Sequence, residues 1–125
     1  MAGRLAGKRI LIVEDHYLIA ADLKRALDRE GADVIGPVGD LDQALTLLEK
    51  HGVDAAVLDV NLEGATSYPI ADRLAARSVP YMFLTGYDGW ALPEAYRRVP
   101  RTTKPFPMSS VLGCMSDLVQ AETSS

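Results

Sequence analysis

The run Ile10-Leu11-Ile12-Val13-Glu14-Asp15 joins a continuous apolar stretch to a pair of acids. Four consecutive apolar residues, most of them β-branched, predict a strand that is buried on both faces, as in a parallel sheet. Two later runs have the same pattern: Ala55-Ala56-Val57-Leu58-Asp59 ends on an acid, and Tyr81-Met82-Phe83-Leu84-Thr85-Gly86 ends on a hydroxyl and a glycine. We therefore expect three buried strands, each with a polar residue at its carboxyl end.

Two weaker strands and five helical patterns account for the rest of the chain. Residues 34–35 predict a short strand before Gly36-Pro37, and residues 99–103 predict a poor strand, in which Pro100 suits an edge position. Helices are expected where apolar residues recur on one helical face. Their expected positions are between Asp15 and Gly31, from the N-cap Asp40 to His51, from Ser67 to Val79, over residues 88–98 and from about residue 107.

The alternation of five strands with five helices predicts a three-layer α/β domain, in which helices cover both faces of a parallel sheet. A length of 125 residues is usual for one domain. We expect this domain to span residues 8–120, with flexible ends at residues 1–7 and 121–125. In such sheets, ligands bind beyond the carboxyl ends of the strands, near the point where the strand order reverses.

Composition favours a soluble, cytoplasmic protein. Apolar residues make up 48% of the chain, no apolar run approaches the roughly 18 residues of a membrane span, and the N-terminus lacks the apolar segment of a signal peptide. The single cysteine, Cys114, cannot form an internal disulfide. The net charge is −4 and there is no Lys/Arg cluster, so we expect protein partners rather than nucleic acid or membrane.

The strand ends place reactive groups at one edge of the predicted sheet. Three carboxylates, one hydroxyl and one ammonium would meet there, from Glu14-Asp15, Asp59, Thr85-Gly86 and Lys104-Pro105. Carboxylates held this close repel one another, and Mg²⁺, which prefers oxygen ligands, relieves the repulsion. We therefore predict a Mg²⁺ site with Asp15 and Asp59 as direct ligands, and with Glu14 acting through water or tuning the charge.

The same groups suit phosphoryl transfer to a carboxylate. An aspartate can act as a covalent nucleophile, and it needs no general base because carboxylates are ionised at neutral pH. Lys104 and the Thr85 hydroxyl would then stabilise the charge on the phosphoryl oxygens. Each residue also has a purely structural explanation, as a helix cap, a turn residue or a solvated lysine. The recurrence of polar residues at successive strand ends favours the functional interpretation.

These residues resemble the receiver domain of bacterial two-component response regulators. The resemblance runs from about Lys8 to Val119 and rests on motifs at four strand ends. The motifs are Ile-Val-Glu-Asp-His around Glu14, Val-Leu-Asp-Val-Asn around Asp59, Phe-Leu-Thr-Gly-Tyr around Thr85, and Lys-Pro-Phe from Lys104. This likeness implies a flavodoxin-like sandwich, with five parallel strands in the order 2-1-3-4-5.

The resemblance also implies a role for each residue of the site. Asp59 would be the phosphoacceptor, and Thr85 and Lys104 would assist the transfer. The backbone carbonyl of Asn61 would join Asp15 and Asp59 around Mg²⁺. The peptide bond between Lys104 and Pro105 is expected to be cis, because X–Pro is the common place for that isomer.

The switch residues depart from the usual pattern of the family. Arg101 stands three residues before Lys104, where family members usually carry Tyr or Phe. Tyr87 instead follows Thr85-Gly86 directly, which resembles the FATGUY subgroup of receivers. We therefore expect a switch set of Thr85, Gly86, Tyr87 and Arg101. Tyr87 either moves with Thr85 or serves only as a half-buried loop aromatic.

The expected function is signalling by phosphorylation. A phosphohistidine on a histidine kinase or histidine phosphotransferase would donate to Asp59, and the added charge would alter a surface that binds a downstream protein. Since no output domain is expected after residue 121, we predict a stand-alone receiver. Its output would be by protein contact, or it would serve as a phosphate relay or sink. It would not be an enzyme, but an acceptor that assists its own phosphorylation and dephosphorylation. The alternative is a degenerate receiver that binds partners without phosphorylation.

Two other classes of protein fit the sequence poorly. A phosphatase of the haloacid dehalogenase type would resemble D-x-D-x-T, whereas Asp59-Val60-Asn61-Leu62-Glu63 lacks the second acid and the hydroxyl. A nucleotide-binding α/β domain would carry a G-x-G-x-x-G or P-loop motif, and the sequence contains neither.

Overall fold

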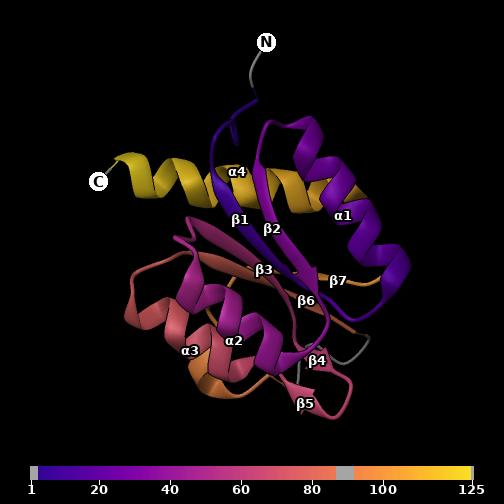
Figure 1. The fold of residues 1–125 in the computed structure, drawn as a ribbon. Helices are drawn as coiled ribbons and strands as arrows, with labels where there is room; N and C mark the ends of the chain where they lie inside the picture. Colours follow the sequence, from indigo (N-terminus) through magenta and orange to yellow (C-terminus); the bar gives the residue numbers. More distant parts are fainter. Residues whose placement is uncertain (1–2, 87–91, 125) are drawn as a thin grey trace.

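The computed structural model describes residues 3–86 and 92–124. Its centre is a five-stranded parallel sheet in the order β2-β1-β3-β6-β7 (Figure 1). The strands of this sheet are β1 (Arg9–Val13), β2 (Asp33–Val38), β3 (Ala55–Asp59), β6 (Tyr81–Thr85) and β7 (Arg101–Thr103). Because β4 (Asn61–Leu62) and β5 (Ala65–Thr66) form a separate antiparallel ribbon, this order is the predicted 2-1-3-4-5. The flavodoxin-like fold class is confirmed.

Helices cover both faces of the sheet (Figure 1). One face carries α1 (Tyr17–Arg29) and α4 (Met108–Ser124), and the other carries α2 (Leu41–Lys50) and α3 (Tyr68–Ala76). Asp40 caps α2, since its carboxylate accepts a hydrogen bond of 3.0 Å from the Gln43 amide. Pro69 lies in the first turn of α3, where no amide hydrogen is needed. Both helix starts follow the prediction.

The sheet separates two hydrophobic cores. Side chains along β1 alternate between these cores, because successive residues of a strand point to opposite faces. Leu11 and Val13 pack with α2 and α3, whereas Ile10 and Ile12 pack with α1 and α4. All four side chains are fully buried, which explains why the apolar run is continuous rather than alternating. Two cores thus hold β1 and set the position of the acids that follow it.

Strand β2 is longer than the sequence predicts. The strand expected at residues 34–35 continues through Gly36-Pro37 to Val38. Within it, a β-bulge inserts one extra residue in β2 relative to β1. Leu11 pairs with Ile35, and two residues later Val13 pairs with Val38, three residues further along β2. Gly36 accommodates the bulge with a φ of +94°. Pro37 has no amide hydrogen to donate, and the edge position of β2 tolerates this.

Over residues 92–98, the segment before β7 does not form the predicted helix. Residues 88–91 and the neighbouring Tyr87 lie outside the described residues. The described part contains a single 3₁₀ turn, η2 (Glu94–Tyr96). Pro93 precedes this turn with a ψ of 151°, an extended conformation that interrupts a helix. β7 then starts at Arg101, which pairs with Phe83, rather than at the predicted residue 99.

The packed part of the chain begins before residue 8. Leu5 is buried in the same core as Leu27, and the Gly7 amide donates a hydrogen bond of 2.9 Å to the Gly31 carbonyl. At the other end, α4 runs to Ser124, beyond the predicted boundary at residue 120. Within residues 3–86 and 92–124, no helix combines the length and the apolar character that a membrane span requires.

Candidate functional site

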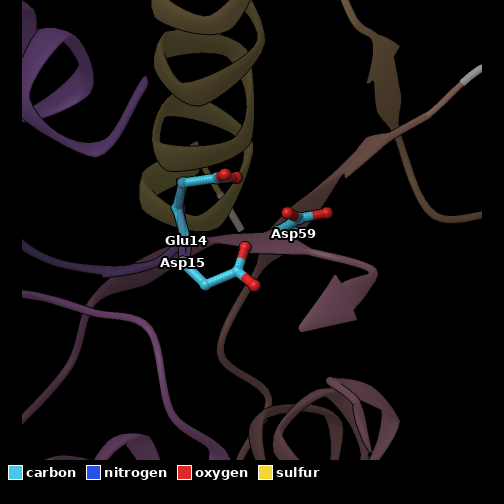
Figure 2. Close-up of side chains that lie close together, drawn as sticks. All are labelled: Glu14, Asp15 and Asp59. Atoms are coloured by element: carbon cyan, nitrogen blue, oxygen red, sulfur yellow. The ribbon is translucent and has the colours of Figure 1, made fainter. Parts of the chain in front are cut away.

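Three carboxylates gather at the carboxyl ends of β1 and β3 (Figure 2). Val13 pairs with Leu58 across these strands, so the residues that follow them, Glu14 and Asp59, are neighbours. With Asp15, they bring one oxygen each to within 4.8 Å of one another. Glu14 and Asp59 are only 2% and 5% exposed, whereas Asp15 is exposed to solvent. The sheet therefore brings together the three acids that the strand ends predict.

Lys104 joins the two buried acids of this cluster. Its Nζ donates one hydrogen bond of 3.0 Å to Glu14 Oε1 and another of 3.0 Å to Asp59 Oδ2. The lysine follows β7, two strands away from β3 in the sheet, and its long side chain spans that distance. The peptide bond to Pro105 is cis, the isomer that the resemblance implies. Lys104 thus lies where a charge can act on Asp59.

Thr85 ends β6 with its hydroxyl turned toward β7. The residue is buried, and its Oγ1 lies 3.3 Å from Oγ1 of Thr103, its partner across the β6–β7 pair. The Thr85 carbonyl also accepts a hydrogen bond of 2.9 Å from the Lys104 amide. Thr103 is a neighbour of the site that sequence reasoning missed. The only feature of the sequence that points to Thr103 is its place directly before Lys104. The pairing register of a short edge strand cannot be predicted from the strand's own sequence.

Backbone amides of the loop after β3 hold two of the acids. The Asn61 amide lies 3.3 Å from Asp59 Oδ1, and the Glu63 amide donates a hydrogen bond of 2.9 Å to Asp15 Oδ2. Both bonds orient a carboxylate without adding charge. Asn61 is therefore next to Asp59, and the role of its carbonyl as a metal ligand stays a prediction.

Of the remaining predicted switch residues, Arg101 makes no contact with the site among the described residues. The Arg101 guanidinium is exposed, and its Nη1 donates a hydrogen bond of 3.2 Å to the Arg97 carbonyl. Gly86 is the last residue described before the gap, and Tyr87 lies outside the described residues. The switch roles of Arg101, Gly86 and Tyr87 therefore stay predictions.

Burial and mutual repulsion alter the charges of the cluster. Burial is the main cause that raises the pKa of Glu14 from 4.5 to about 7. The negative charge of Asp59 adds to this rise, and Lys104 opposes it. Burial acts to lower the pKa of Lys104, but hydrogen bonds and charge interactions with Asp59 and Glu14 outweigh it, so that pKa is raised overall. In the metal-free protein the lysine stays charged, while Glu14 holds a proton more readily than an exposed glutamate.

The residues present fit a hard divalent cation. When Glu14 also loses its proton, the three carboxylates against one ammonium leave two negative charges without a counter-ion. Glu14 Oε1 accepts hydrogen bonds from Lys104 and from the His16 amide, but Oε2 is buried and has no partner among the described residues. An unpaired buried carboxylate oxygen is costly unless a cation or an ordered water satisfies it. Oxygen donors and net charge together match the requirements of Mg²⁺.

The fold and this site agree with what a family comparison finds. The family model described as the response regulator receiver domain matches residues 10–98, a span that includes Glu14, Asp15, Asp59 and Thr85. The chain belongs to the family of response regulator receiver domains, which act in two-component systems. Receiver domains generally bind Mg²⁺ in an acidic pocket, and this chain brings Glu14, Asp15 and Asp59 together as an acidic group.

Individual relatives support the same family. The transcriptional regulatory protein PdtaR of Mycobacterium tuberculosis is 31% identical over 109 residues, which cover 84% of this chain and 53% of PdtaR. The solution structure of SdrG from Sphingomonas melonis Fr1 has a TM-score of 0.80 and 39% identity, and covers 90% of this chain and 97% of SdrG. The crystal structure of PhyR from Brucella abortus has a TM-score of 0.84 and 27% identity, and covers 97% of this chain and 51% of PhyR. The chain thus spans about half the length of PdtaR and of PhyR, but nearly all of SdrG.

Proposed function

We propose that this chain accepts a phosphoryl group on Asp59 from a phosphohistidine of a partner protein, with Mg²⁺ bound beside it, and that it does so as an acceptor rather than as a turnover enzyme. The observation that carries this proposal is the position of Lys104, whose ammonium lies 3.0 Å from both Glu14 and Asp59. A positive charge there balances an acid in the free protein and can pair with a phosphoryl oxygen after transfer.

The transfer would be a displacement at phosphorus. A carboxylate oxygen of Asp59 forms a bond to phosphorus while the phosphorus–nitrogen bond of the phosphohistidine breaks. The electron pair of the broken bond stays on the imidazole, which takes up a proton from solvent. Lys104 and the Thr85 hydroxyl would donate hydrogen bonds to the phosphoryl oxygens. For Thr85, this means exchanging its contact with Thr103 for one with the phosphoryl group.

Four groups of this chain would hold the metal. Asp15, Asp59 and the Asn61 backbone carbonyl would coordinate it directly, and Glu14 would reach it through water. When bound, Mg²⁺ supplies positive charge that balances the acids and the phosphoryl oxygens. The 4.8 Å clustering of the three carboxylates and the unpartnered Oε2 of Glu14 support this assignment.

An apolar surface beside the site favours a protein as the donor. Tyr17 and Leu18, the first residues of α1, are 81% and 67% exposed and follow shortly after Asp15. Large apolar side chains exposed next to a reactive group suit an interface that covers them. We propose that a histidine kinase or histidine phosphotransferase docks here, in the cytoplasm. Phosphorylation then adds roughly −1.5 to −2 charges at Asp59 and shifts the surface that a downstream protein recognises.

Labelling with a small phosphodonor tests the acceptor. With Mg²⁺ and acetyl phosphate, the wild-type chain is expected to gain the mass of one phosphoryl group, in a linkage that is stable to acid and labile to base. Asp59→Asn should abolish the gain, because it removes the nucleophilic oxygen. Asp33→Asn is the matched control, since Asp33 begins β2 at the opposite end of the strands. Full labelling of Asp59→Asn, or no labelling of the wild type, would overturn the proposal.

The class of donor is tested separately. Replacing Tyr17 and Leu18 by Ser is expected to slow transfer from a phosphorylated histidine phosphotransferase, while labelling by acetyl phosphate stays unchanged. This difference follows because the small donor needs no docking surface. Equal slowing of both reactions would show that these two side chains support the site itself and not the partner.

A further inference from the structure

We infer that Gly39, directly after β2, is a positioning residue that holds Asp15 in place for the cation. The inference rests on the proposed Mg²⁺ site and deepens it. Gly39 has no side chain and so offers no side-chain ligand atom. Its effect is on where the backbone of Asp15 lies.

Gly39 packs directly against Asp15. A Cβ at position 39 would lie 2.8 Å from Asp15 Cα, 3.0 Å from Asp15 Cβ and 3.4 Å from the Glu14 carbonyl oxygen. Carbon atoms do not approach so closely, so any side chain at this position would push Asp15 away from β2. Gly39 is not among the glycines with positive φ, so close approach, and not backbone conformation, is what requires glycine here.

The β-bulge of β2 brings Gly39 to this place. With regular pairing, Val38 would lie opposite Glu14, and its branched side chain would occupy the space beside the acids. The extra residue instead pairs Val38 with Val13 and lets the Glu14 amide donate a hydrogen bond of 2.9 Å to the Val38 carbonyl. The next residue, Gly39, then lies beside the acid pair. Bulges next to functional sites commonly re-aim a strand in this way.

The bulge has its own requirement for glycine. Gly36 has a φ of +94°, and a Cβ there would lie 3.0 Å from the Ile12 carbonyl oxygen and 3.0 Å from the Val38 amide nitrogen. A side chain at position 36 would therefore both strain the backbone and separate the two strands. Two glycines thus allow the end of β2 to reach Asp15.

Asp15 is held at two points. Gly39 limits the position of its backbone, and the Glu63 amide holds its carboxylate with a hydrogen bond of 2.9 Å. Asp15 is exposed, so packing against other side chains does not fix it. Mg²⁺ demands near-octahedral geometry, and ligand oxygens must be held within roughly 0.5 Å of their working positions. Gly39 and Glu63 together meet this demand.

Metal titration without any phosphodonor tests the inference. Gly39→Ala is expected to weaken Mg²⁺ binding by roughly tenfold or more, as loss of an outer partner of a metal ligand does, measured by calorimetry with MgCl₂ alone. The NMR signal of the Glu63 amide should move in the same variant, because its acceptor Asp15 is displaced. Gly113→Ala is the matched control, since a Cβ on that exposed helical glycine meets nothing within 4 Å.

A double variant separates positioning from a general effect on the fold. If Gly39 acts through Asp15, adding Gly39→Ala to Asp15→Asn should change Mg²⁺ affinity by less than about twofold. An equal loss in both backgrounds, or unchanged affinity of Gly39→Ala in the wild-type background, would overturn the inference. A wild-type chain that binds no Mg²⁺ would instead overturn the proposed function.

A measurement on the wild-type chain covers the case in which Gly39→Ala does not fold. The nuclear Overhauser contact between the α-protons of Gly39 and Asp15 should be present without metal and persist when MgCl₂ is added, because the contact is already formed in the free protein. Absence of this contact, or its loss on adding metal, would also overturn the inference.

Discussion

Lys104 Nζ lies 3.0 Å from Glu14 Oε1, although 90 residues separate them in the chain. This bond connects the end of β7 to the end of β1, and the side chain of Glu14 is completely buried where it forms. Lys104 is 23% exposed at its side chain, so solvent screens the pair only in part. The stability of the protein should therefore depend on this lysine, on pH and on metal.

Replacing Lys104 by Met is expected to destabilise the metal-free chain. The change leaves Glu14 and Asp59 buried without their counter-charge, which costs on the order of 2 kcal/mol, less than for a pair fully shielded from water. Mg²⁺ should restore part of the loss, because it supplies positive charge to the same acids. Urea unfolding with and without MgCl₂ measures both effects.

The matched control for this variant is Lys24→Met. Lys24 pairs with Asp28 at 2.8 Å on the surface of α1, with both side chains close to half exposed. Such a pair contributes roughly 0.5 kcal/mol or less. Equal destabilisation by the two substitutions would show that Lys104 has no special role in the acidic cluster.

The stability of the metal-free chain should fall as pH rises through the pKa of Glu14. Burial and the charge of Asp59 raise that pKa to about 7 from 4.5, so folding favours the protonated form. The contribution of Glu14 is therefore fully present below about pH 4.5 and is lost as pH rises to about 7, a change on the order of 3 kcal/mol. Unfolding free energies measured with a chelator at several pH values give this slope.

The isosteric variant Glu14→Gln isolates this contribution. It removes the titrating group and should flatten the pH dependence between about pH 4.5 and about pH 7. Mg²⁺ should flatten the dependence of the wild type as well, because it binds the ionised carboxylates. Identical slopes for the wild type and Glu14→Gln would contradict the prediction.

Thr85→Val is expected to slow labelling of Asp59 by acetyl phosphate roughly tenfold or more, because one hydrogen-bond donor to the phosphoryl oxygens is lost. Thr103→Val removes only the present partner of the Thr85 hydroxyl, at 3.3 Å, and should change the rate by less than about threefold. A time course of phosphorylation compares the two. A larger effect of Thr103→Val would mean that the Thr85–Thr103 contact, and not Thr85 alone, sets the rate.

Tyr96 should stabilise the chain chiefly through its ring. The ring stacks on Tyr68, with centroids 4.4 Å apart and planes 8° from parallel, and its hydroxyl donates a hydrogen bond of 2.8 Å to Asp72. Tyr96→Phe keeps the stack and should cost about 0.5 kcal/mol, whereas Tyr96→Ala should cost about 2 kcal/mol. Urea unfolding of the two variants measures the difference. Similar losses would indicate that the hydrogen bond to Asp72 dominates.

Patterns of apolar and capping residues within a few positions of one another are enough to predict most of the secondary structure. The apolar runs before Glu14 and Asp59 predict buried strands, because burial on both faces leaves no room for alternation. Asp40 predicts the start of α2, because a capping side chain acts on an amide only three residues away. The same reasoning predicts an acidic cluster, since the carboxyl ends of parallel strands meet at one edge.

The pattern is less informative where structure depends on distant neighbours. The bulge at Gly36 follows from how β2 meets β1. Over the described residues 92–98, a 3₁₀ turn after Pro93 stands in place of the expected helix. Helix and strand propensities are weak where tertiary contacts compete with them.

The amino-acid sequence alone determines which polar residues follow the strand ends, because the strands and their ends depend on contacts within a few residues. Folding in three dimensions decided the rest: which oxygen Lys104 binds, that Thr103 holds the Thr85 hydroxyl, and that Gly39 lies against Asp15. Those contacts join segments that are 18 to 90 residues apart. Their distances depend on strand register, on the bulge and on packing between layers, which no local pattern encodes.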